Sequence, residues 1–503
     1  MPEMNIRPSD DDRRLLLSRR AFLGRGGSGL GALALSTLLA ESAGLGLSAC
    51  TSAPSPASSN PDPRARTGRP TLIPRAKRVL CLFQSGGASH IDLFDQKPEL
   101  WKRAGQDLPP SVKGNQRVTG MTSGQSSFPV VPPLRDGRRC GESGSWISDL
   151  LPSLQGVADK LCLVKSVTTE AINHDPAVTY LNTGNQIPGH ASMGAWVSYG
   201  LGSENRNLPA FLSMISQGSG KNPGQPIFSR LWGSGYLPSS HQGVSLRPGA
   251  NPVLYLQNPD GVDRSHRRAM LDDLEALNAL HAQKSGDPET EARIAAYEMA
   301  FRMQTSVPEL TELRDETAAT LALYGPDVAR PGSYAANCLL ARRLLERGVR
   351  FVELFHRGWD QHIALSRQLP NQCSDIDRPT AALIRDLEAR GMLDDTLVLF
   401  LTEFGRTAYC QGGFGDPNSG RDHHGRCFTV WLAGGGVRGG IEYGRTDDFS
   451  YNIVENPVQV RDLHATMLHC LGIDHTTLTY RYRGLDAKLT GVEPARVIDE
   501  ILV

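Results

Sequence analysis

Short apolar runs recur along the chain and predict the strands of a buried sheet. They occupy residues 78–84, 161–167, 349–355, 397–406 and 427–433. Runs that stay apolar at successive positions are typical of parallel strands that helices cover on both faces. The run at 397–406 is the most informative, because Leu-Val-Leu-Phe-Leu passes directly into Thr-Glu-Phe-Gly-Arg. Such a strand delivers a charge to the rim of the sheet, where the ligands of open α/β sheets collect.

Several of the segments between these runs show the spacing of apolar residues that is typical of helices. Apolar residues spaced three and four apart predict helices at 333–347 and 379–390. The second helix joins the strand at 349–355 to the strand that begins at 397, which completes a β-α-β unit and a parallel strand pair. The pattern therefore predicts an α/β fold with a mainly parallel sheet flanked by helices.

A block in the middle of the chain is helical in pattern and lacks strand-like runs. It comprises residues 263–284, 289–304 and 308–323. The block predicts a helical insertion, about 262–325, that packs on the sheet rather than within it.

The sequence of the first 75 residues predicts an export signal and a tether that are not part of the folded domain. Ser18-Arg19-Arg20-Ala21-Phe22-Leu23 and the mildly apolar stretch after it resemble a twin-arginine signal peptide covering residues 1–49. Leu47-Ser48-Ala49-Cys50 resembles a lipoprotein cleavage box with Cys50 lipidated, unless the box is a chance match and an ordinary peptidase cuts nearby. Residues 50–75, which begin rich in Ser, Pro and Ala, then form a lipid-anchored flexible tether. We expect an α/β domain at 76–503, in the periplasm or cell envelope.

Charge and cysteine content narrow the choice of partners. The chain has 53 basic and 53 acidic residues, so its formal net charge is zero. This balance argues against nucleic acid and against a membrane surface held by charge, which leaves a lipid anchor as the expected membrane contact. Nine cysteines are scattered without a Cys-x-x-Cys pair, which argues against a zinc ribbon. An oxidising compartment permits disulfides among them, but the spacing indicates no pairing.

Carboxylates and histidines follow the carboxyl ends of the predicted strands. Asp360 and His362 are two residues apart just beyond one strand, so on an extended chain they face the same way and can hold one ion. Glu403 directly follows another strand, and His423 and His424 are adjacent in the Gly-rich loop after it. Because the carboxyl ends of parallel strands meet at one edge, we expect these side chains to meet there. Carboxylates combined with imidazoles favour zinc or manganese, with calcium as a further option and one or two ions in all.

Three other positions are candidates for the site, and for Asp92 and Ser192 a structural role competes with the chemical one. Asp92, at the end of Ser85-Gly86-Gly87-Ala88-Ser89-His90-Ile91-Asp92, is either a metal or substrate ligand or part of a helix cap. His174 lies just past the strand at 161–167. Ser192 lies on a Gly-flanked turn that opens an apparent helix, where it is either a nucleophile or an N-cap.

From residue 76 to its end the chain resembles a twin-arginine-exported, sulfatase-like family within the alkaline-phosphatase-like superfamily. The resemblance is carried by Ser85-Gly86-Gly87-Ala88-Ser89-His90-Ile91-Asp92-Leu93-Phe94-Asp95, Gly358-Trp359-Asp360-Gln361-His362, Thr402-Glu403-Phe404-Gly405-Arg406-Thr407, Gly420-Arg421-Asp422-His423-His424 and Asp462-Leu463-His464-Ala465-Thr466. It implies an alkaline-phosphatase-like or sulfatase-like fold and a metal-dependent hydrolase that acts on a sulfate or phosphate ester of a small molecule or glycan.

The resemblance also implies roles for individual residues. The implied metal ligands are Asp360, His362, Glu403 and His424, with His423 as the alternate to His424 and Asp92 as a substitute for a strand-end Asp. The implied catalytic residues are Ser192 as nucleophile, His174 and Arg406.

Two departures from the superfamily pattern favour an alternative function, and a third argues against formylglycine chemistry. Ser85 stands where that strand-end Asp is expected, and Phe404 stands where a second ligand histidine is expected. The sulfatase signature, Cys or Ser followed by x-Pro-x-Arg, occurs nowhere in the chain. The alternative function is a degenerate, non-catalytic metal- or glycan-binding member of the same fold.

Export gives the first testable prediction. Changing Arg19 and Arg20 together to Lys should hold the precursor in the cytoplasm, because the signal is read through its arginine pair. Cys50→Ala should release or stall an unlipidated form, measured by cell fractionation and by labelling with a radioactive fatty acid. Unchanged membrane association of the Cys50→Ala protein would contradict the lipid anchor and leave the export signal standing.

Overall fold

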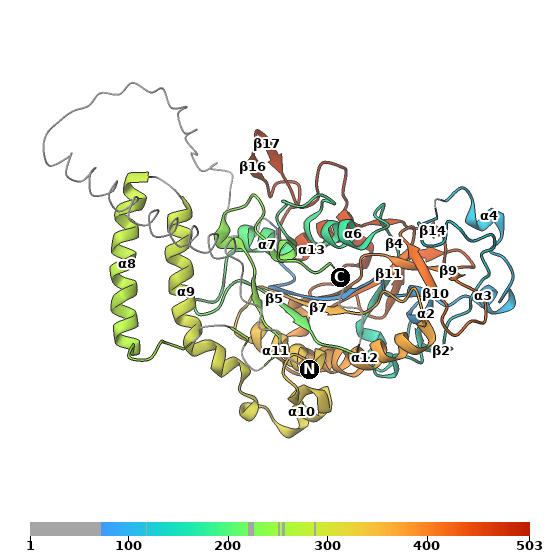
Figure 1. Cartoon of the computed structure of the whole chain (residues 1–503), viewed down its shortest axis with the longest axis horizontal. Helices are drawn as coiled ribbons and strands as arrows, with labels where there is room; N and C mark the ends of the chain where they lie inside the picture. Colours follow the sequence, from blue (N-terminus) through green and yellow to red (C-terminus); the bar gives the residue numbers. More distant parts are fainter. Residues whose placement is uncertain (1–71, 117, 220–225, 250–251, 254–256, 286–287) are drawn as a thin grey trace, which may run out of the picture. The chain divides into compact units, whose positions relative to one another are not determined.

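The domain is built on a nine-stranded, mostly parallel sheet, seen in a computed structural model (Figure 1). The structure describes residues 72–116, 118–219, 226–249, 252–253, 257–285 and 288–503. The strand order is β12-β4-β11-β8-β1-β7-β5-β6, with β15 paired to β4. Within this sheet, β11 runs antiparallel to β4 and β8, and the other pairs are parallel. The strands are β1 (Arg78–Ser85), β4 (Cys162–Thr168), β5 (Phe211–Ser216), β6 (Val244–Leu246), β7 (Phe351–Arg357), β8 (Thr396–Leu401), β11 (Phe428–Ala433), β12 (Ile441–Tyr443) and β15 (Val458–Gln459).

Each central strand buries both of its faces, which is why its sequence shows a continuous apolar run. All six residues of β8 are buried. On β1, Leu80 and Leu82 belong to one hydrophobic core, while Cys81 and Phe83 belong to a second core. Successive strand side chains point to opposite faces, so each strand contributes alternate residues to the two cores. The predicted α/β class and mainly parallel sheet are confirmed.

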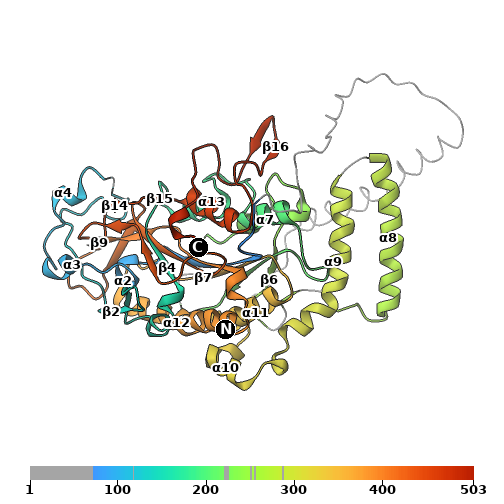
Figure 2. The same cartoon turned by 180° about the vertical axis from the view of Figure 1, so that it is seen from behind.

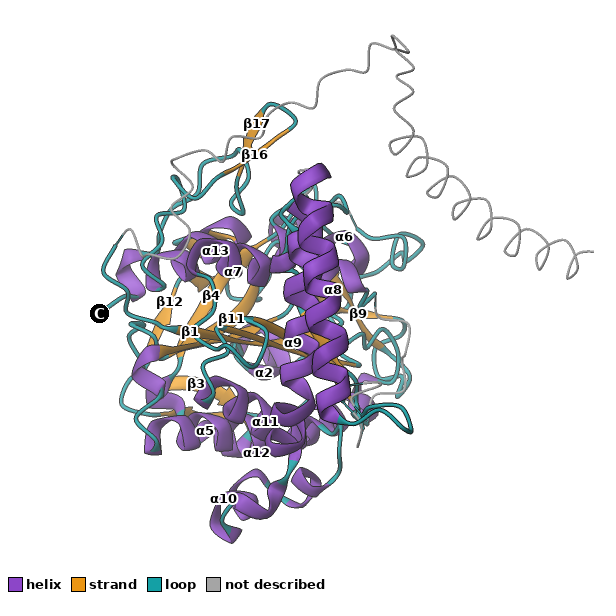
Figure 3. Ribbon diagram, turned by 90° about the vertical axis from the view of Figure 1, so that its left-hand side faces the viewer, coloured by secondary structure: helices purple, strands orange, loops and turns teal. Residues whose placement is uncertain are grey.

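Helices cover both faces of the sheet (Figure 3). Figure 3 shows α7 and α13 on one side and α5, α11 and α12 on the other. These helices are α5 (Pro152–Gln155), α6 (His174–Thr183), α7 (Met193–Leu201), α11 (Tyr334–Glu346), α12 (Leu365–Ala389) and α13 (Val460–Cys470). As predicted, α12 links β7 to β8, although it begins well before residue 379 and contains Pro370 and Pro379.

The middle block of the domain is mainly helical in its described residues, as predicted. It contains α8 (Arg264–Ser285), α9 (Pro288–Thr311) and α10 (Ala318–Tyr324), none of which joins the sheet (Figures 1 and 2). The expected break between helices at 304 and 308 does not occur, because α9 continues through Pro308 to Thr311. Pro308 has no backbone N–H to donate, so α9 lacks one hydrogen bond near its end and continues for three residues beyond this proline.

The segment after Glu403 is a second sheet rather than the Gly-rich loop that the sequence predicts. Strands β9 (Gly405–Gln411) and β10 (Gly420–His424) pair antiparallel, with a register shift between Arg421 and His423. The remaining elements are short. They are α2 (His90–Leu93), α3 (Pro98–Lys102), α4 (Pro110–Lys113), β2 (Gly137–Cys140), β3 (Ser145–Ser148), β13 (Arg445–Thr446), β14 (Ile453–Glu455), β16 (Tyr480–Tyr482) and β17 (Leu485–Ala487).

The predicted signal peptide, Cys50 and most of the tether lie outside the described residues. The described part of the tether contacts the domain, since the backbone amides of Leu72 and Arg75 donate to the carbonyls of Gly472 and Cys470. The eight cysteines from Cys81 to Cys470 are all free and buried. Among the described helices, none is long and apolar enough to cross a membrane.

Glu353 is an acid in the middle of β7 and almost fully buried. It pairs with Cys81 on β1 and with Ser213 on β5, and its Oε1 has no hydrogen-bond partner among the described residues. Burial raises the pKa of Glu353 well above its ordinary value of 4.5. The folded protein therefore keeps this carboxyl protonated to a higher pH than the unfolded chain does.

Glu353→Gln should remove a loss of stability that the native protein suffers as the pH rises. Below pH 4.5 the carboxyl is protonated in both states, so the native protein and the variant should have similar pH profiles. Above that pH the unfolded chain ionises first, which costs the native fold about 1.4 kcal/mol per pH unit up to the folded-state pKa. Urea unfolding of both proteins between pH 4 and 8 measures this. Parallel profiles over the whole range would mean that Glu353 ionises equally in both states.

Candidate metal centre

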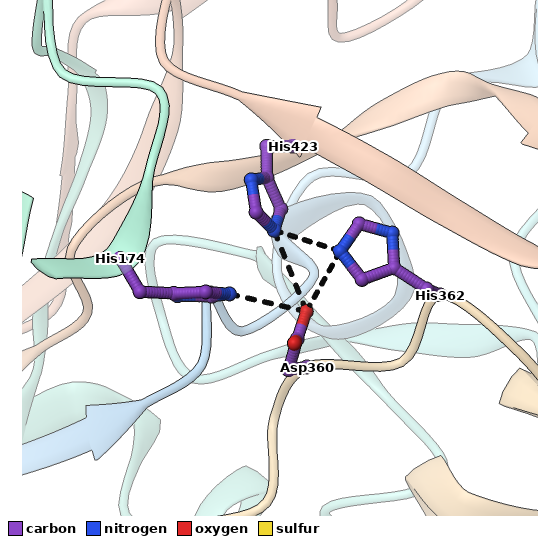
Figure 4. A group of neighbouring side chains, drawn as sticks. All are labelled: His174, Asp360, His362 and His423. Carbon is purple, nitrogen blue, oxygen red and sulfur yellow. Dashed lines mark hydrogen bonds and ion pairs between the residues drawn. The ribbon is translucent and has the colours of Figure 1, made fainter. Parts of the chain in front are cut away.

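Four side chains from three separate segments converge at the carboxyl rim of the sheet (Figure 4). His174 opens α6 after β4, Asp360 and His362 follow β7, and His423 lies on β10. One ligand atom from each of them lies within 4.8 Å of the others. The side chains of His174, Asp360 and His362 remain 13–14% exposed, so the centre is reached from solvent.

The distances are close to those of a four-donor metal site. Oδ1 of Asp360 lies 3.2 Å from Nε2 of His174, 3.0 Å from Nε2 of His362 and 3.4 Å from Nε2 of His423. The Nε2 atoms of His362 and His423 are 2.8 Å apart. Donors in a tetrahedral zinc site, at 2.0–2.1 Å from the ion, lie about 3.3 Å from one another.

The second nitrogen of each imidazole is held by an oxygen acceptor. Nδ1 of His174 donates to Oε1 of Glu403 at 2.7 Å, and Nδ1 of His362 contacts Oε1 of Gln411 at 2.5 Å. Nδ1 of His423 donates to the carbonyl of Ile172 at 2.8 Å. With each Nδ1 protonated, the three Nε2 lone pairs face the Asp360 carboxylate, and histidine ligands of metals are oriented in this way.

These lone pairs need a cation between them. Nε2 of His174 is buried and has no hydrogen-bond partner among the described residues. Two neutral Nε2 atoms at 2.8 Å repel each other unless a proton or a metal ion lies between them. Three imidazoles and one carboxylate form a donor set that suits zinc or another transition metal. The residues present therefore fit a divalent ion.

The charges and burial at the centre shift the pKa values of its ligands in different directions. Burial opposes ionisation of Asp360, but its contacts with the three imidazoles and the charge of Arg406 hold the pKa of Asp360 well below its usual range. Burial lowers the pKa of His423 to about 4, so its ring is neutral at pH 7. Burial also acts against the charged form of His174, but Asp360 and Glu403 outweigh it and raise the pKa of His174. A bound cation would take the place of that proton.

Two adjacent glycines let the three strand ends approach one another. Gly86 has a φ of 123°, and a Cβ there would lie 2.5 Å from the backbone nitrogen of Asp360. Only glycine permits both this conformation and this contact. The amide of Gly86 donates to Oε1 of Glu403 at 2.8 Å, which joins the end of β1 to the end of β8.

The side chain of Arg406 forms hydrogen bonds with the same loops. It is 1% exposed, and its NH2 group donates to Oδ1 of Asp360 at 2.7 Å. Its other contacts are with backbone carbonyls of Gly86, Gly87, Trp359 and Arg421. The sequence predicted a catalytic Arg406, whereas the structure shows its guanidinium committed to Asp360 and to the backbone. Arg406 is therefore a positioning residue for the carboxylate.

The structure brings His423, and not His424, to the centre. Neighbouring strand residues point to opposite faces, so β10 directs only one of the two imidazoles to Asp360. The register shift just before His423 sets which one this is. His424 instead stacks on Tyr451 with ring centroids 4.2 Å apart and contacts the Tyr451 carbonyl through Nε2 at 2.7 Å.

Two other expected ligands lie outside the four-residue cluster. Asp92 is fully buried in an ion pair with Arg421 at 2.8 Å and accepts a hydrogen bond from Ser89. Glu403 reaches the centre only through His174, which it orients. Expected as a ligand, Glu403 is a supporting carboxylate here, because its Oε1 already accepts two hydrogen bonds.

The expected nucleophile is also engaged elsewhere. Ser192 occupies the N-cap position of α7, as the alternative interpretation predicted, but its side chain makes no capping hydrogen bond. Its Oγ donates instead to the carbonyl of Gly233 at 2.9 Å. It is 1% exposed. These contacts give a nucleophilic Ser192 no support, so that role remains a prediction from resemblance.

Sequence reasoning missed two of the groups that orient the imidazoles. Gln411 lies on a strand that was expected to be a loop, and the Ile172 carbonyl has no side-chain signal at all. His174 was singled out as catalytic because it follows a strand end, and the same observation could have placed it among the ligands.

A cavity of about 410 Å³ adjoins the centre through His423. Its lining is rich in hydroxyl groups and contains one arginine, Arg426, which is exposed. The polar lining residues include Gln116, Thr119, Thr168, Thr169, Glu170, Tyr409 and Tyr451. The volume lies within the range of about 300–1000 Å³ that is usual for small-molecule sites.

Comparisons with known proteins place the chain in a family. Residues 76–502 match the model of a family described as "Protein of unknown function (DUF1501)", and the chain belongs to this family. A comparison with curated proteins found no match.

Several solved structures are similar to the chain at low identity. A protein in the alkaline phosphatase superfamily from Vibrio parahaemolyticus is 8% identical, with a TM-score of 0.34 over 82% of this chain and 71% of that one. The PsFucS1 sulfatase from Pseudoalteromonas sp. is 13% identical, with a TM-score of 0.31 over 79% and 68%. The C-terminal periplasmic domain of EcEptC from Escherichia coli, in complex with Zn, is 8% identical, with a TM-score of 0.32 over 80% and 86%. The chemistry of this chain rests on its own residues.

The adjacent histidines provide a matched test of the centre. His423→Gln should weaken zinc retention by at least about tenfold, because changes even in residues that support ligands cost ten- to a hundredfold. His424→Gln should retain zinc, because its imidazole contacts Tyr451 instead. Zinc per protein, measured by elemental analysis after dialysis against a weak chelator, compares the two variants. Equal losses in both, or a loss only in His424→Gln, would contradict the assignment.

Proposed function

We propose that this member of the DUF1501 family is a metal-dependent hydrolase of phosphate or sulfate esters. The observation that carries the proposal is the convergence of three Nε2 lone pairs on the Asp360 carboxylate, at a rim that is open to solvent. Such a donor set serves no purpose in packing. It is suited to holding one divalent ion, with zinc favoured by the imidazoles and manganese next.

Some residues of the centre would bind the ion, and Arg406 orients one of them. His174, Asp360, His362 and His423 would hold the ion, and Arg406 keeps Asp360 in place through the contact at 2.7 Å. A divalent ion held there would supply Lewis-acid chemistry, polarising an ester oxygen and lowering the pKa of a water molecule. The lowered pKa of His423 leaves its Nε2 free of a proton at neutral pH, so metal binding does not compete with protonation at this ring.

The cavity beside His423 suggests how an ester is bound. The exposed guanidinium of Arg426 offers a charged hydrogen-bond donor to a phosphate or sulfate group. The threonine and tyrosine hydroxyls of the lining offer donors and acceptors suited to the hydroxyl groups of a glycan or other polyol. The proposed substrate is therefore an ester of a small polar molecule or glycan.

A second function is favoured by the number of donors. Four protein ligands can close a tetrahedral shell, as in structural zinc sites, whereas catalytic sites keep a position open. Phe404 fills the space beside the cluster, with its ring centroid 4.4 Å from that of His423 and 5.0 Å from that of His174. A closed site would make the protein a metal- or glycan-binding member of the family without hydrolytic activity.

The place of action is proposed from the sequence. Arg19-Arg20 and the box ending at Cys50 support export by the twin-arginine route and a lipid anchor in the periplasm or cell envelope. The route matters for the metal centre, because twin-arginine substrates are exported after folding.

The test of the proposed function combines metal content with turnover. Wild-type protein loaded with zinc or manganese should hydrolyse an aryl phosphate or an aryl sulfate, and Asp360→Asn should lose both the metal and the activity. Arg426→Ala should raise the KM for the charged ester about ten- to a hundredfold, as expected for a lost charged hydrogen bond, and should retain the metal.

The control is Arg483→Ala, an exposed arginine that does not line the cavity, which should leave KM unchanged. Metal bound at full occupancy without turnover of either ester would select the closed, non-catalytic site. Failure of the wild-type protein to bind a divalent ion would overturn both functions.

A further inference from the structure

A second cavity, of about 250 Å³, lies where the inserted helices meet the body of the domain. Its lining comes from the end of α9, from Leu313, from α11, from residues 328–332 and from Arg247, Gly249 and Pro252. Figures 1 and 2 show α9, α10 and α11 around this junction. None of the four residues of the metal centre lines it.

The walls of this cavity are mainly apolar. Leu310, Leu313, Val328, Leu339 and Leu340 line it, together with prolines and small residues. An apolar cavity with a few polar groups is the usual form of a small-molecule site. The volume is below the range of about 300–1000 Å³ that is typical of drug-sized ligands, so it selects a small molecule.

The polar part of the lining consists mostly of hydrogen-bond donors. Arg247 and Arg343 line the cavity, and no aspartate or glutamate is among its described lining residues. Nε of Arg343 and Nδ2 of Asn337 are buried and have no hydrogen-bond partner among the described residues. Arg343 is 2% exposed and Asn337 is 6% exposed. Buried polar groups without a partner are rare in native proteins, and each one calls for an explanation.

The other nitrogens of Arg343 are already engaged. NH1 lies 2.9 Å from Oε1 of Glu316, and NH2 donates to the carbonyl of Glu309 at 2.8 Å. Glu316 also pairs with Arg342 at 2.6 Å. Arg342 also contacts Glu346 and Asp386, so it does not depend on Glu316 alone. Arg343 is left with one donor, its Nε, that has no hydrogen-bond partner among the described residues.

We propose that this cavity binds a small monocarboxylate with an aliphatic or aromatic body. The carboxylate would accept hydrogen bonds from Nε of Arg343 and Nδ2 of Asn337, and the body would pack on the leucine walls. An ionised acceptor strengthens such hydrogen bonds and satisfies both unpaired donors. Arg247, which is exposed, adds positive charge at the solvent side. The ligand bridges α9 and α11, so its binding stabilises the insertion against the domain, independently of the metal centre.

Titration of the full chain with hexanoate tests this inference. Isothermal calorimetry should show saturable one-to-one binding, and the melting temperature should rise with hexanoate concentration. Hexanamide and 1-hexanol, which have a similar body without the charge, should bind at least about tenfold more weakly, because hydrogen bonds to a charged group are the stronger ones. Equal binding of the neutral compounds, or no saturable binding of hexanoate, would overturn the proposal.

Two matched variants locate the site without disturbing Arg343, whose buried ion pair supports the fold. Ala329 lines the cavity and is exposed, so Ala329→Trp should block the opening and abolish hexanoate binding. Ala319 is exposed on α10 and does not line the cavity, so Ala319→Trp should bind as the wild type does. Asn337→Leu should weaken binding about tenfold or more. Unchanged binding in Ala329→Trp would place the ligand elsewhere and overturn the assignment.

The chain length of the bound carboxylate distinguishes a lipid acyl chain from a short soluble acid. Decanoate that binds more tightly than hexanoate identifies the acyl chain of a lipid, while weaker binding of decanoate identifies a short soluble acid. Both outcomes support a monocarboxylate site.

Discussion

The buried pair of Arg406 and Asp360 is the interaction on which the candidate centre depends. Asp360 is surrounded by three histidines and carries a negative charge at a largely buried position. Arg406 compensates for that charge at 2.7 Å, and its remaining donors hold the backbone of four other residues. Removing one partner of a buried charge pair generally costs about 3–5 kcal/mol, so this pair links the stability of the rim to the geometry of the ligands.

The sheet brings together the short segments that carry these groups. Because β1, β4, β7 and β8 run in the same direction, their carboxyl ends lie at one edge, and the groups that follow them meet. Gly86 allows the ends of β1 and β7 to approach within the distance at which a Cβ would clash. Glu403, which follows β8, accepts a hydrogen bond from His174. The central strand of the sheet thereby fixes the orientation of an imidazole at the start of α6.

Two features of the centre favour different functions. Partial exposure and a neighbouring polar cavity suit a site that binds a substrate, and four donors around one point suit a closed structural site. Arg406 bears on this balance, because a carboxylate that also pairs with an arginine shares its charge between two cations. An ion would then be held mainly by the three imidazoles, which leaves a coordination position for substrate or water.

The sequence by itself determined five of the nine strands of the main sheet, the helical insertion and the side on which Asp360 and His362 face. These features are local, since an apolar run, a helical period and a spacing of two residues are properties of neighbouring positions. Tertiary structure decided which of His423 and His424 reaches Asp360, because a register shift between β9 and β10 depends on pairing across the chain. It also made Glu403 a support for His174 and directed the Ser192 hydroxyl to the carbonyl of Gly233, since each contact is made with a partner distant in sequence. Periodicity carries no information on such partners, because they are brought together only when the sheet forms.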